Sequence, residues 1–129
     1  MLRIIDMTNI IAPNTTLTGR SALAYRNFGT SSDPRVIFCA SKEVETDKYC
    51  QPIWVVPMDA EFEAEEYNGV QIATINQAIF DSFRYDYDDS HIEEMIECMD
   101  IDDFTAWLED RPAYKELIAD KLEEYLGDI

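Results

Sequence analysis

The fold class is decided where the chain changes its periodicity, in the stretch Asn68-Gly69-Val70-Gln71-Ile72-Ala73-Thr74-Ile75-Asn76-Gln77-Ala78-Ile79. Asn68-Gly69 indicates a two-residue hairpin turn, and the following Val70-Gln71-Ile72 alternates as a strand does. From Thr74 onward, apolar residues recur about every 3.6 positions, which indicates a helix capped by the Thr74 hydroxyl. The stretch therefore predicts that a strand-rich part ends here and a helical part begins.

Upstream of this stretch, two apolar runs have the length and composition of strands. Residues 36–40 form a continuous β-branched and aromatic run, and residues 53–56 form a second run between two prolines. Thr18 can cap one short helix, which Gly29 ends. Together with the alternating residues 61–65, these runs predict a small twisted, mainly antiparallel sheet of about three to five strands.

Downstream, the sequence predicts about four helices. After the helix that Thr74 caps, a second begins at the capping box Ser90-His91-Ile92-Glu93. A third can start at Asp100 or Asp102, and a fourth opens with Pro112 in its first turn and ends at Gly127. The side chains predicted to face the core are, helix by helix, Ile75, Ala78, Ile79, Ser82 and Phe83; Ile92, Met95, Ile96 and Met99; Phe104, Trp107 and Leu108; and Tyr114, Leu117, Ile118, Lys121, Leu122 and Tyr125.

The length and composition predict one domain. The chain has 129 residues, of which 47% are apolar, and no long repeat or linker interrupts it. A chain of this size can bury about two-thirds of its unfolded surface in one core. We therefore expect a single α+β domain over residues 1–129, with a strand-rich, near-neutral part (1–73) and a helical, acidic part (74–129).

The charge is distributed very unevenly along the chain. Its 27 acidic and 10 basic residues give a net charge of −17. Residues 1–58 carry five acids and six bases, whereas residues 59–129 carry 22 acids and four bases. A net charge of about 2–8 is ample for the solubility of a small domain, and self-repulsion opposes folding. The excess predicts an anionic binding face, although a merely solvated helix surface is the alternative.

The helical periodicity directs most of these acids away from the predicted core. Few have a lysine or arginine four residues later, and Glu116, Asp120 and Glu124 are like-charge neighbours at that spacing. Such a face attracts basic proteins or basic clefts and repels nucleic acid. The predicted partner-binding residues are Asp86, Asp88, Asp89, Glu93, Glu94, Glu97, Asp102, Asp103, Glu109, Asp110, Glu116, Asp120, Glu123 and Glu124.

The sequence contains none of the common catalytic or cofactor motifs. GxGxxG, GxxxxGK[ST], HExxH and CxxC are all missing from it. The single histidine, His91, is predicted in the first turn of a helix, where the dipole disfavours a protonated ring. No serine or cysteine lies at a motif-like spacing from it. We therefore predict a protein that is not an enzyme and needs no cofactor.

Two possible metal sites are considered and rejected. Position 6 of a calcium-loop count that begins at Asp86 should be glycine but is His91, and a helix is predicted from there. The oxygen-bearing residues of that count are Asp86, Asp88, Ser90, Glu94 and Glu97. Zinc would need ligands brought together by the fold, because none of Cys39, Cys50, Cys98 and His91 form a pair at ligand spacing.

The compartment is predicted from what the chain lacks. No apolar run approaches the roughly 20 residues needed to span a bilayer. The first residues have neither a basic region nor a long apolar run of the kind found in signal peptides. Three widely spaced cysteines suit a reducing compartment. We expect a cytoplasmic protein that does not contact a membrane.

One family resemblance can be drawn from ordered small-residue and strand positions over Leu17–Phe83. These positions are Leu17-Thr18-Gly19-Arg20-Ser21-Ala22-Leu23, Phe28-Gly29, Pro34, the run Val36–Cys39, and Asn68–Thr74 leading to Ala78 and Asp81. They resemble the C-terminal domain of the AbiEi abortive-infection antitoxin family. In that family, the domain follows a DNA-repressing winged helix and accompanies a nucleotidyltransferase toxin. The resemblance implies an antitoxin-like domain that neutralises a toxin by direct contact, while the acidic charge does not suit DNA repression.

In overall character, the chain is similar to small acidic DNA mimics, including some anti-CRISPR proteins. Carboxylates spaced on a helical surface can replace phosphates against lysine and arginine. The leading hypothesis is a non-catalytic inhibitor, from a phage or mobile element, of a basic nucleic-acid-binding protein such as a CRISPR effector nuclease. An AbiEi-like antitoxin domain and an orphan acidic structural domain are the alternatives. Aromatic residues that could anchor the interface, or belong to the core instead, are Tyr85, Tyr87, Trp107, Tyr114 and Tyr125.

Overall fold

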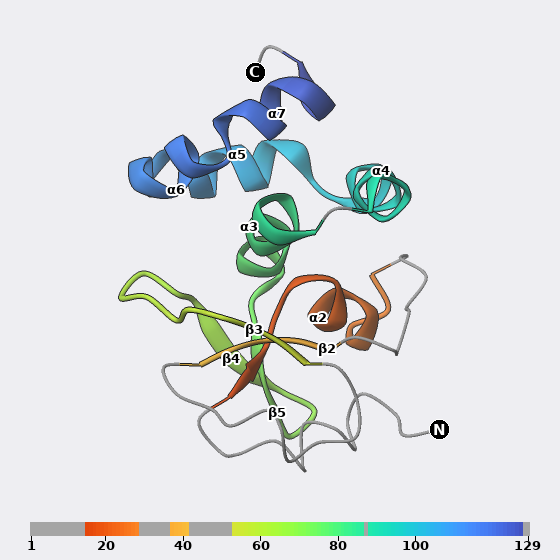
Figure 1. Ribbon diagram of the computed structural model, residues 1–129, viewed down its shortest axis with the longest axis vertical. Helices are drawn as coiled ribbons and strands as arrows, with labels where there is room; N and C mark the ends of the chain where they lie inside the picture. The colour runs from red at the N-terminus through yellow and green to blue at the C-terminus, as the bar shows by residue number, and fades with distance from the viewer. Residues whose placement is uncertain (1–14, 29–36, 42–52, 87, 128–129) are drawn as a thin grey trace.

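The computed structural model describes residues 15–28, 37–41, 53–86 and 88–127. Among these residues, a five-stranded sheet and one helix form the lower part of Figure 1, and a stack of helices forms the upper part. The α+β class predicted from the change of periodicity is confirmed. Residues named above that lie outside the described part are Gly29, Pro34, Val36, Cys50 and Tyr87.

The sheet is built from five strands: β1 (Thr16–Leu17), β2 (Ile37–Ala40), β3 (Ile53–Val56), β4 (Ala64–Tyr67) and β5 (Val70–Ala73). Their order is β3-β2-β1-β5-β4. The pairs β1–β2 and β4–β5 are antiparallel, whereas β1–β5 and β2–β3 are parallel. The sheet is therefore mixed, and not mainly antiparallel as the sequence predicted. The prediction is wrong because a tight hairpin joins β4 and β5, whereas parallel neighbours need longer connections that local sequence does not reveal.

The predicted hairpin turn between β4 and β5 is confirmed. Asn68 and Gly69 have positive φ angles of 51° and 80°. A type I′ turn requires positive φ at both central positions, and asparagine and glycine adopt it most readily. The turn sets the register of β5, in which Val70 and Ile72 are buried and the residue between them is exposed.

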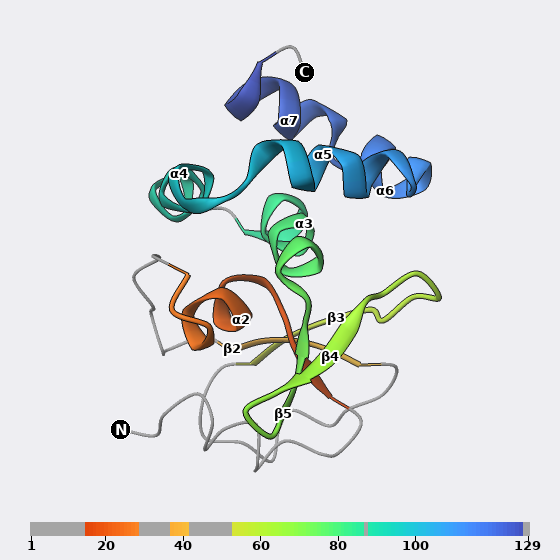
Figure 2. The ribbon, with the colours of Figure 1, turned by 180° about the vertical axis from the view of Figure 1, so that it is seen from behind.

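Helix α3 (Ile75–Tyr85) lies in the middle of the molecule, with the sheet and the preceding helix on one side and the helices that follow it in the chain on the other (Figures 1 and 2). The Thr74 hydroxyl oxygen accepts the backbone N–H of Gln77 at 3.4 Å, as the predicted cap requires. The predicted inward positions are buried, except that Ile75 is 39% exposed. Ile75 is the first residue of the helix.

Helix α2 (Gly19–Tyr25) packs against α3 and against β2. Thr18 is its N-cap residue, as predicted, but the Thr18 hydroxyl makes no cap bond. It donates instead to Oδ2 of Asp81 on α3, at 2.5 Å. Gly19 has a φ of +56°, and a Cβ at this position would lie 3.5 Å from the Phe38 side chain. The chain therefore enters α2 through a conformation that favours glycine.

Helix α4 (Asp89–Cys98) begins two residues earlier than predicted. Its N-cap is Asp88, whose Oδ1 accepts the backbone N–H of His91 at 3.3 Å. The predicted capping box at Ser90 is therefore wrong, because the Asp88 carboxylate caps the helix and Ser90 lies within its first turn. Ile92 and Met95 face the core as predicted.

Helix α5 (Ile101–Glu109) starts at one of the two predicted positions. Asp100 is the N-cap, and its Oδ1 accepts the backbone N–H of Asp103 at 3.0 Å. Phe104 and Leu108 are buried, as the helical period predicted.

The predicted last helix is divided into α6 (Pro112–Leu117) and α7 (Ala119–Leu126), with a break at Ile118. Ile118 is buried, whereas Leu117 is 54% exposed and does not face the core as predicted. A continuous helix over residues 112–126 would run straight for roughly 22 Å. The break instead turns α7 back above α5 (Figure 1), and Gly127 ends α7 as predicted.

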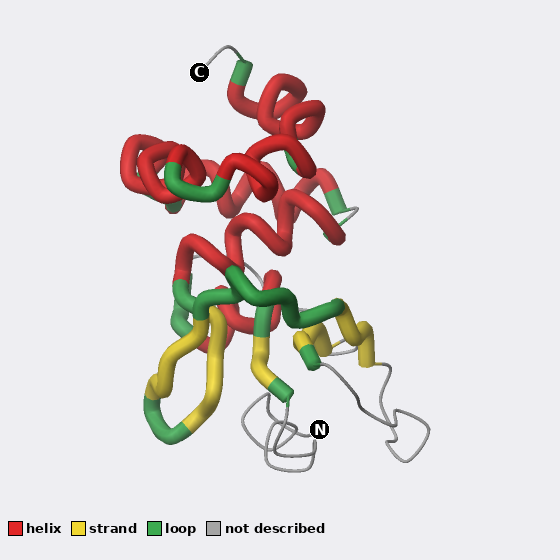
Figure 3. The backbone as a smooth tube through the Cα atoms, turned by 90° about the vertical axis from the view of Figure 1, so that its left-hand side faces the viewer, coloured by secondary structure: helices red, strands yellow, loops and turns green. Residues whose placement is uncertain are grey.

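One cluster of buried side chains connects the sheet with the helices. It extends from Leu17 and Ile72 in the sheet, through Phe80 in α3, to Leu122 in α7. The rings of Phe80 and Tyr114 stack with their centroids 4.0 Å apart. Figure 3 shows the same arrangement from the side, with the helices layered above the strands. The sheet and the helical part therefore share a single core.

Candidate functional site

Most of the predicted partner-binding acids lie on the outer surface of helices α4 to α7. Glu94 is half-buried, and Asp86 is buried. The exposed residues of the set are Asp88, Asp89, Glu93, Glu97, Asp102, Asp103, Glu109, Asp110, Glu116, Asp120, Glu123 and Glu124.

Asp86 does not belong to this surface, and its prediction as a partner-binding residue is corrected. It ends α3 with 2% of its surface exposed, and its Oδ2 lies 2.6 Å from Nδ1 of the buried His91. The backbone N–H of Asp88 donates to its Oδ1 at 3.0 Å. Burial by itself would raise the pKa of Asp86, but the His91 and Asp88 contacts, with the charge of Arg20, lower it. Asp86 is therefore an ionised structural residue.

Arg20 of α2 connects the start of α4 with the sheet part of the molecule. Its Nε lies 3.8 Å from Oδ2 of Asp86, and its Nη1 lies 3.6 Å from Oδ2 of Asp88. Asp89 accepts a hydrogen bond from the Tyr125 hydroxyl of α7. The three acids around the start of α4 are thus occupied by contacts within the protein.

Other predicted acids also have partners. Lys115 Nζ donates to Oε1 of Glu109 at 2.6 Å, and the Asn76 amide donates to Oδ2 of Asp103 at 3.1 Å. We use the term unpaired acidic surface for the exposed acids of α4–α7 whose side chains make no hydrogen bond or ion pair with any described residue. Its members are Glu93, Glu97, Asp102, Asp110, Glu116, Asp120, Glu123 and Glu124.

Tyr125 of α7 bonds to Asp89 of α4 and lies near carboxylates of both helices. The pKa of Tyr125 is raised to about 12, first by its hydrogen bond to Asp89 and then by burial and the charges of Asp89, Glu124 and Glu93. Acids from both α4 and α7 therefore raise the pKa of the same hydroxyl group. Among the aromatic residues predicted as anchors, Tyr114 is buried, and those that are half-buried are Tyr85, Trp107 and Tyr125.

Sequence reasoning missed a group of acids that join the sheet to the helices. Glu63, just before β4, accepts hydrogen bonds from the Thr74 hydroxyl at 2.7 Å and from Trp107 Nε1 at 3.3 Å. It also pairs with Arg111 Nη2 at 3.0 Å. No local pattern around Glu63 indicates this role, because its partners are 11 to 48 residues away.

Asp59 and Asp81 complete this junction between the two parts of the molecule. The Tyr114 hydroxyl donates to Oδ1 of Asp59 at 2.6 Å. Burial raises the pKa of Asp81 to about 7, although hydrogen bonds from Thr18 and Gln77 favour its ionised form. A carboxylate counted as fully charged in the sequence is therefore partly protonated near neutral pH.

The residues considered for catalysis and metal binding are spread through the structure. His91 is 4% exposed and faces Asp86, and no group of three or more His, Cys, Asp or Glu side chains among the described residues is arranged to hold a metal ion. Cys39 is buried in β2, and burial raises its pKa to about 11, whereas Cys98 is exposed.

Within the described ranges, none of the helices combines the length and apolar character required to cross a bilayer.

Comparison with known proteins adds no relative. No family model, curated protein or solved structure matches this chain. The feature that distinguishes this part of the molecule is its carboxylates, which form an exposed surface over four packed helices.

Proposed function

We propose that this chain is a non-catalytic inhibitor that binds a basic nucleic-acid-handling protein by replacing the phosphates of its nucleic acid. The unpaired acidic surface of α4–α7 carries the proposal. A CRISPR effector nuclease is one partner of this kind, and counter-defence by a phage or mobile element is the corresponding role. A cytoplasmic location follows, because such partners act on intracellular nucleic acid.

The physical basis is an electric field that the protein itself does not neutralise. Uncompensated charges of one sign attract a partner of opposite sign and accelerate its association. When a carboxylate surface occupies a basic cleft that normally holds nucleic acid, counterions are released, as they are when nucleic acid binds there. The same field repels nucleic acid, so the partner is a protein.

The carboxylates are held on helices that the core keeps in place. Met95, Phe104, Leu108 and Leu122 are buried beneath them, and Asp88 and Asp100 cap two of the helices. Charges fixed on packed helices lose less conformational entropy on binding than charges on a disordered acidic tail. Because the carboxylates keep fixed positions, they can match the spacing of phosphates, which a disordered acidic tail cannot do.

The proposal is tested by competition with the partner's own nucleic acid. A CRISPR effector nuclease is saturated with fluorescent nucleic acid, and this protein is titrated in while the anisotropy is followed. We expect displacement whose midpoint rises in proportion to the nucleic-acid concentration. The logarithm of affinity should also fall steeply and linearly with the logarithm of salt concentration.

Matched charge reversals locate the surface. The double variant Glu93→Lys and Glu97→Lys should weaken displacement on the order of tenfold or more. The control, Glu61→Lys and Glu66→Lys, reverses the same number of exposed charges near β4 and should change it by less than about threefold. Equal effects of the two pairs would contradict the assignment to α4–α7.

The alternatives predict no displacement in this titration, and a second titration against a nucleotidyltransferase toxin separates them from each other. An antitoxin-like domain would bind its toxin whether or not nucleic acid is present, and with a shallow salt dependence. An orphan acidic structural domain would displace nothing at any salt concentration.

A further inference from the structure

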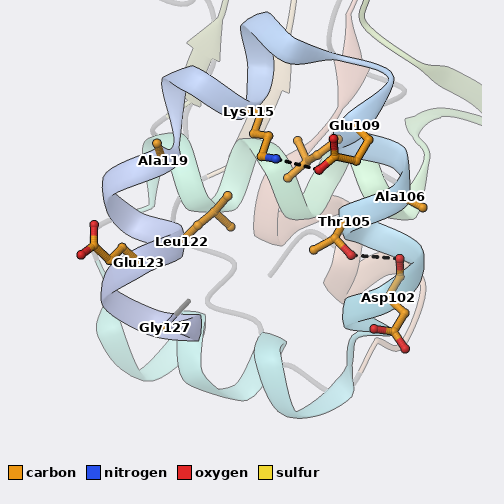
Figure 4. Close-up of a pocket in the computed structure, with 10 residues that line it drawn as sticks. Asp102, Thr105, Ala106, Glu109, Lys115, Ala119, Leu122, Glu123 and Gly127 are labelled. Atoms are coloured by element: carbon orange, nitrogen blue, oxygen red, sulfur yellow. Dashed lines mark hydrogen bonds and ion pairs between the residues drawn. The ribbon is translucent and has the colours of Figure 1, made fainter. Parts of the chain in front are cut away.

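A groove lies between helices α5, α6 and α7, within the same part of the molecule as the unpaired acidic surface (Figure 4). Its volume is about 560 Å³. Leu108 and Leu122 lie at its floor, and exposed Ala106 and Ala119 make its walls mainly apolar. The groove therefore offers an apolar surface inside an otherwise acidic region.

The groove is open because the residues along its sides are small. Thr105 and Ala106 of α5 and Ala119 of α7 line it, where larger side chains would fill the space between the helices. The Thr105 hydroxyl donates to the backbone carbonyl oxygen of Ile101 at 2.9 Å. This side chain is therefore satisfied within its own helix and demands no polar ligand.

The rim of the groove carries acids from both sides. Asp102 lies on α5 and Glu123 on α7, and Figure 4 shows them on opposite sides of the opening. Glu109 pairs with Lys115 at the end of the groove next to α6. Three acids and one lysine among the lining residues leave a net negative rim around an apolar interior.

We infer that this groove receives an apolar side chain from a basic amphipathic helix of the partner protein, with flanking lysines or arginines against Asp102 and Glu123. Helices α5 and α7 have nine and eight residues, so the sides of the groove are roughly 12–14 Å long. That length matches about two turns of a third helix. The inference rests on the proposed function and adds an apolar anchor to its electrostatic contacts.

The acidic rim and the apolar interior together favour a partner segment that is both basic and amphipathic. An apolar helix without lysines would leave the rim acids at a poorly solvated interface, and a lysine segment without apolar residues would leave the groove unfilled. A segment with leucines at i, i+3, i+4 and i+7 and lysines elsewhere satisfies both requirements.

The test uses a synthetic fluorescein-labelled helical peptide with this leucine and lysine pattern, titrated into the whole protein. A second peptide keeps every lysine and replaces the leucines with glutamine. We expect saturable binding of the first peptide, and binding of the second that is weaker on the order of tenfold or more.

Groove-filling variants locate the binding site without changing any charge. Ala119→Phe and Ala106→Phe should each weaken binding of the leucine peptide on the order of tenfold. The control Ala113→Phe places the same ring on an exposed alanine of α6 that does not line the groove, and it should leave affinity within about twofold. Two separate filling positions, with circular dichroism to confirm folding, distinguish blocked binding from a misfolded variant.

The inference would be overturned by no saturable binding of the leucine peptide, by equal binding of the glutamine peptide, or by full binding to both groove-filled variants. Uptake of a small apolar molecule without peptide binding would also overturn it. If groove filling has no effect while Glu93→Lys and Glu97→Lys prevent displacement of nucleic acid, the groove inference fails and the proposed function stands. If peptide binding depends on the groove but nucleic acid is never displaced, mimicry fails instead.

Discussion

The acids at the junction between sheet and helices and the acids on the outer surface of α4–α7 are the same residue types in opposite surroundings. At the junction, Glu63 has three partners and Asp86 is buried against His91. On the outer surface, Glu97 and Glu124 have no hydrogen-bond or ion-pair partner among the described residues. A charge count treats all of these carboxylates as equal, but only the second group is free to meet another protein.

The difference has opposite consequences for stability. A buried polar group must be hydrogen-bonded or paired, so removing a junction acid leaves its former partners unsatisfied. An exposed acid among like charges contributes repulsion instead. Removing Glu63 or Asp86 should therefore lower the free energy of unfolding, whereas removing the repulsion between outer acids should raise it.

The largest expected effect is the loss of Asp86. Asp86→Ala leaves the buried His91 ring and the half-buried Arg20 without their carboxylate, and should lower the free energy of unfolding by about 3 kcal/mol. Urea denaturation at pH 7 measures it. The control Glu97→Ala, from the outer surface of α4, should change it by less than about 0.5 kcal/mol. A loss below about 1 kcal/mol for Asp86→Ala would mean that the junction does not depend on this pair.

Asp81 should make the stability depend on pH. Because burial raises its pKa to about 7, the folded state favours the protonated acid, and this stabilisation is complete below pH 4 and is lost as pH rises through 7. Asp81→Asn cannot ionise. Its free energy of unfolding should therefore rise relative to the unsubstituted protein on the order of 1 kcal/mol per pH unit between about pH 5 and 7. A difference that stays constant over this range would show that Asp81 ionises normally in the fold.

The Glu63 contacts should have a smaller effect, because this side chain is 40% exposed. Glu63→Gln weakens its bonds to Thr74, Trp107 and Arg111, and should cost about 1 kcal/mol. Glu66→Gln, on an exposed position of the neighbouring strand, is the control and should be nearly neutral. Thermal unfolding of both variants measures the difference, and indistinguishable midpoints would remove Glu63 from the junction.

The smallest effect is expected on α7 and has the opposite sign. Glu124→Lys replaces a like-charge neighbour of Asp120 with an opposite charge four residues later in the same helix. The free energy of unfolding should increase by about 0.3–0.5 kcal/mol in urea denaturation. Added salt should reduce this gain, since the charges are exposed. A destabilised variant would show that Glu124 has a structural role like that of the junction acids.

Several features of the fold were predictable because they depend on neighbours in sequence. The Asn68-Gly69 turn needs positive φ at two adjacent residues, and the Thr74 cap needs a hydroxyl three residues before an N–H. The change from strand to helical period at Thr74 likewise predicted the α+β class. The exposure of most acids followed from the helical period, which also identified Phe104 and Leu108 as core residues.

The sequence by itself thus determined the local elements and the large excess of acid in the helical part, because turns, caps and periodicity act over a few residues. Only the tertiary structure decided which acids are structural, since the partners of Glu63, Asp81 and Asp86 include residues far away in the chain. It also broke the last helix at Ile118 and paired the strands in a mixed sheet. Burial in a shared core governs these outcomes, and the energy of burial depends on what the fold brings together rather than on the order of the residues.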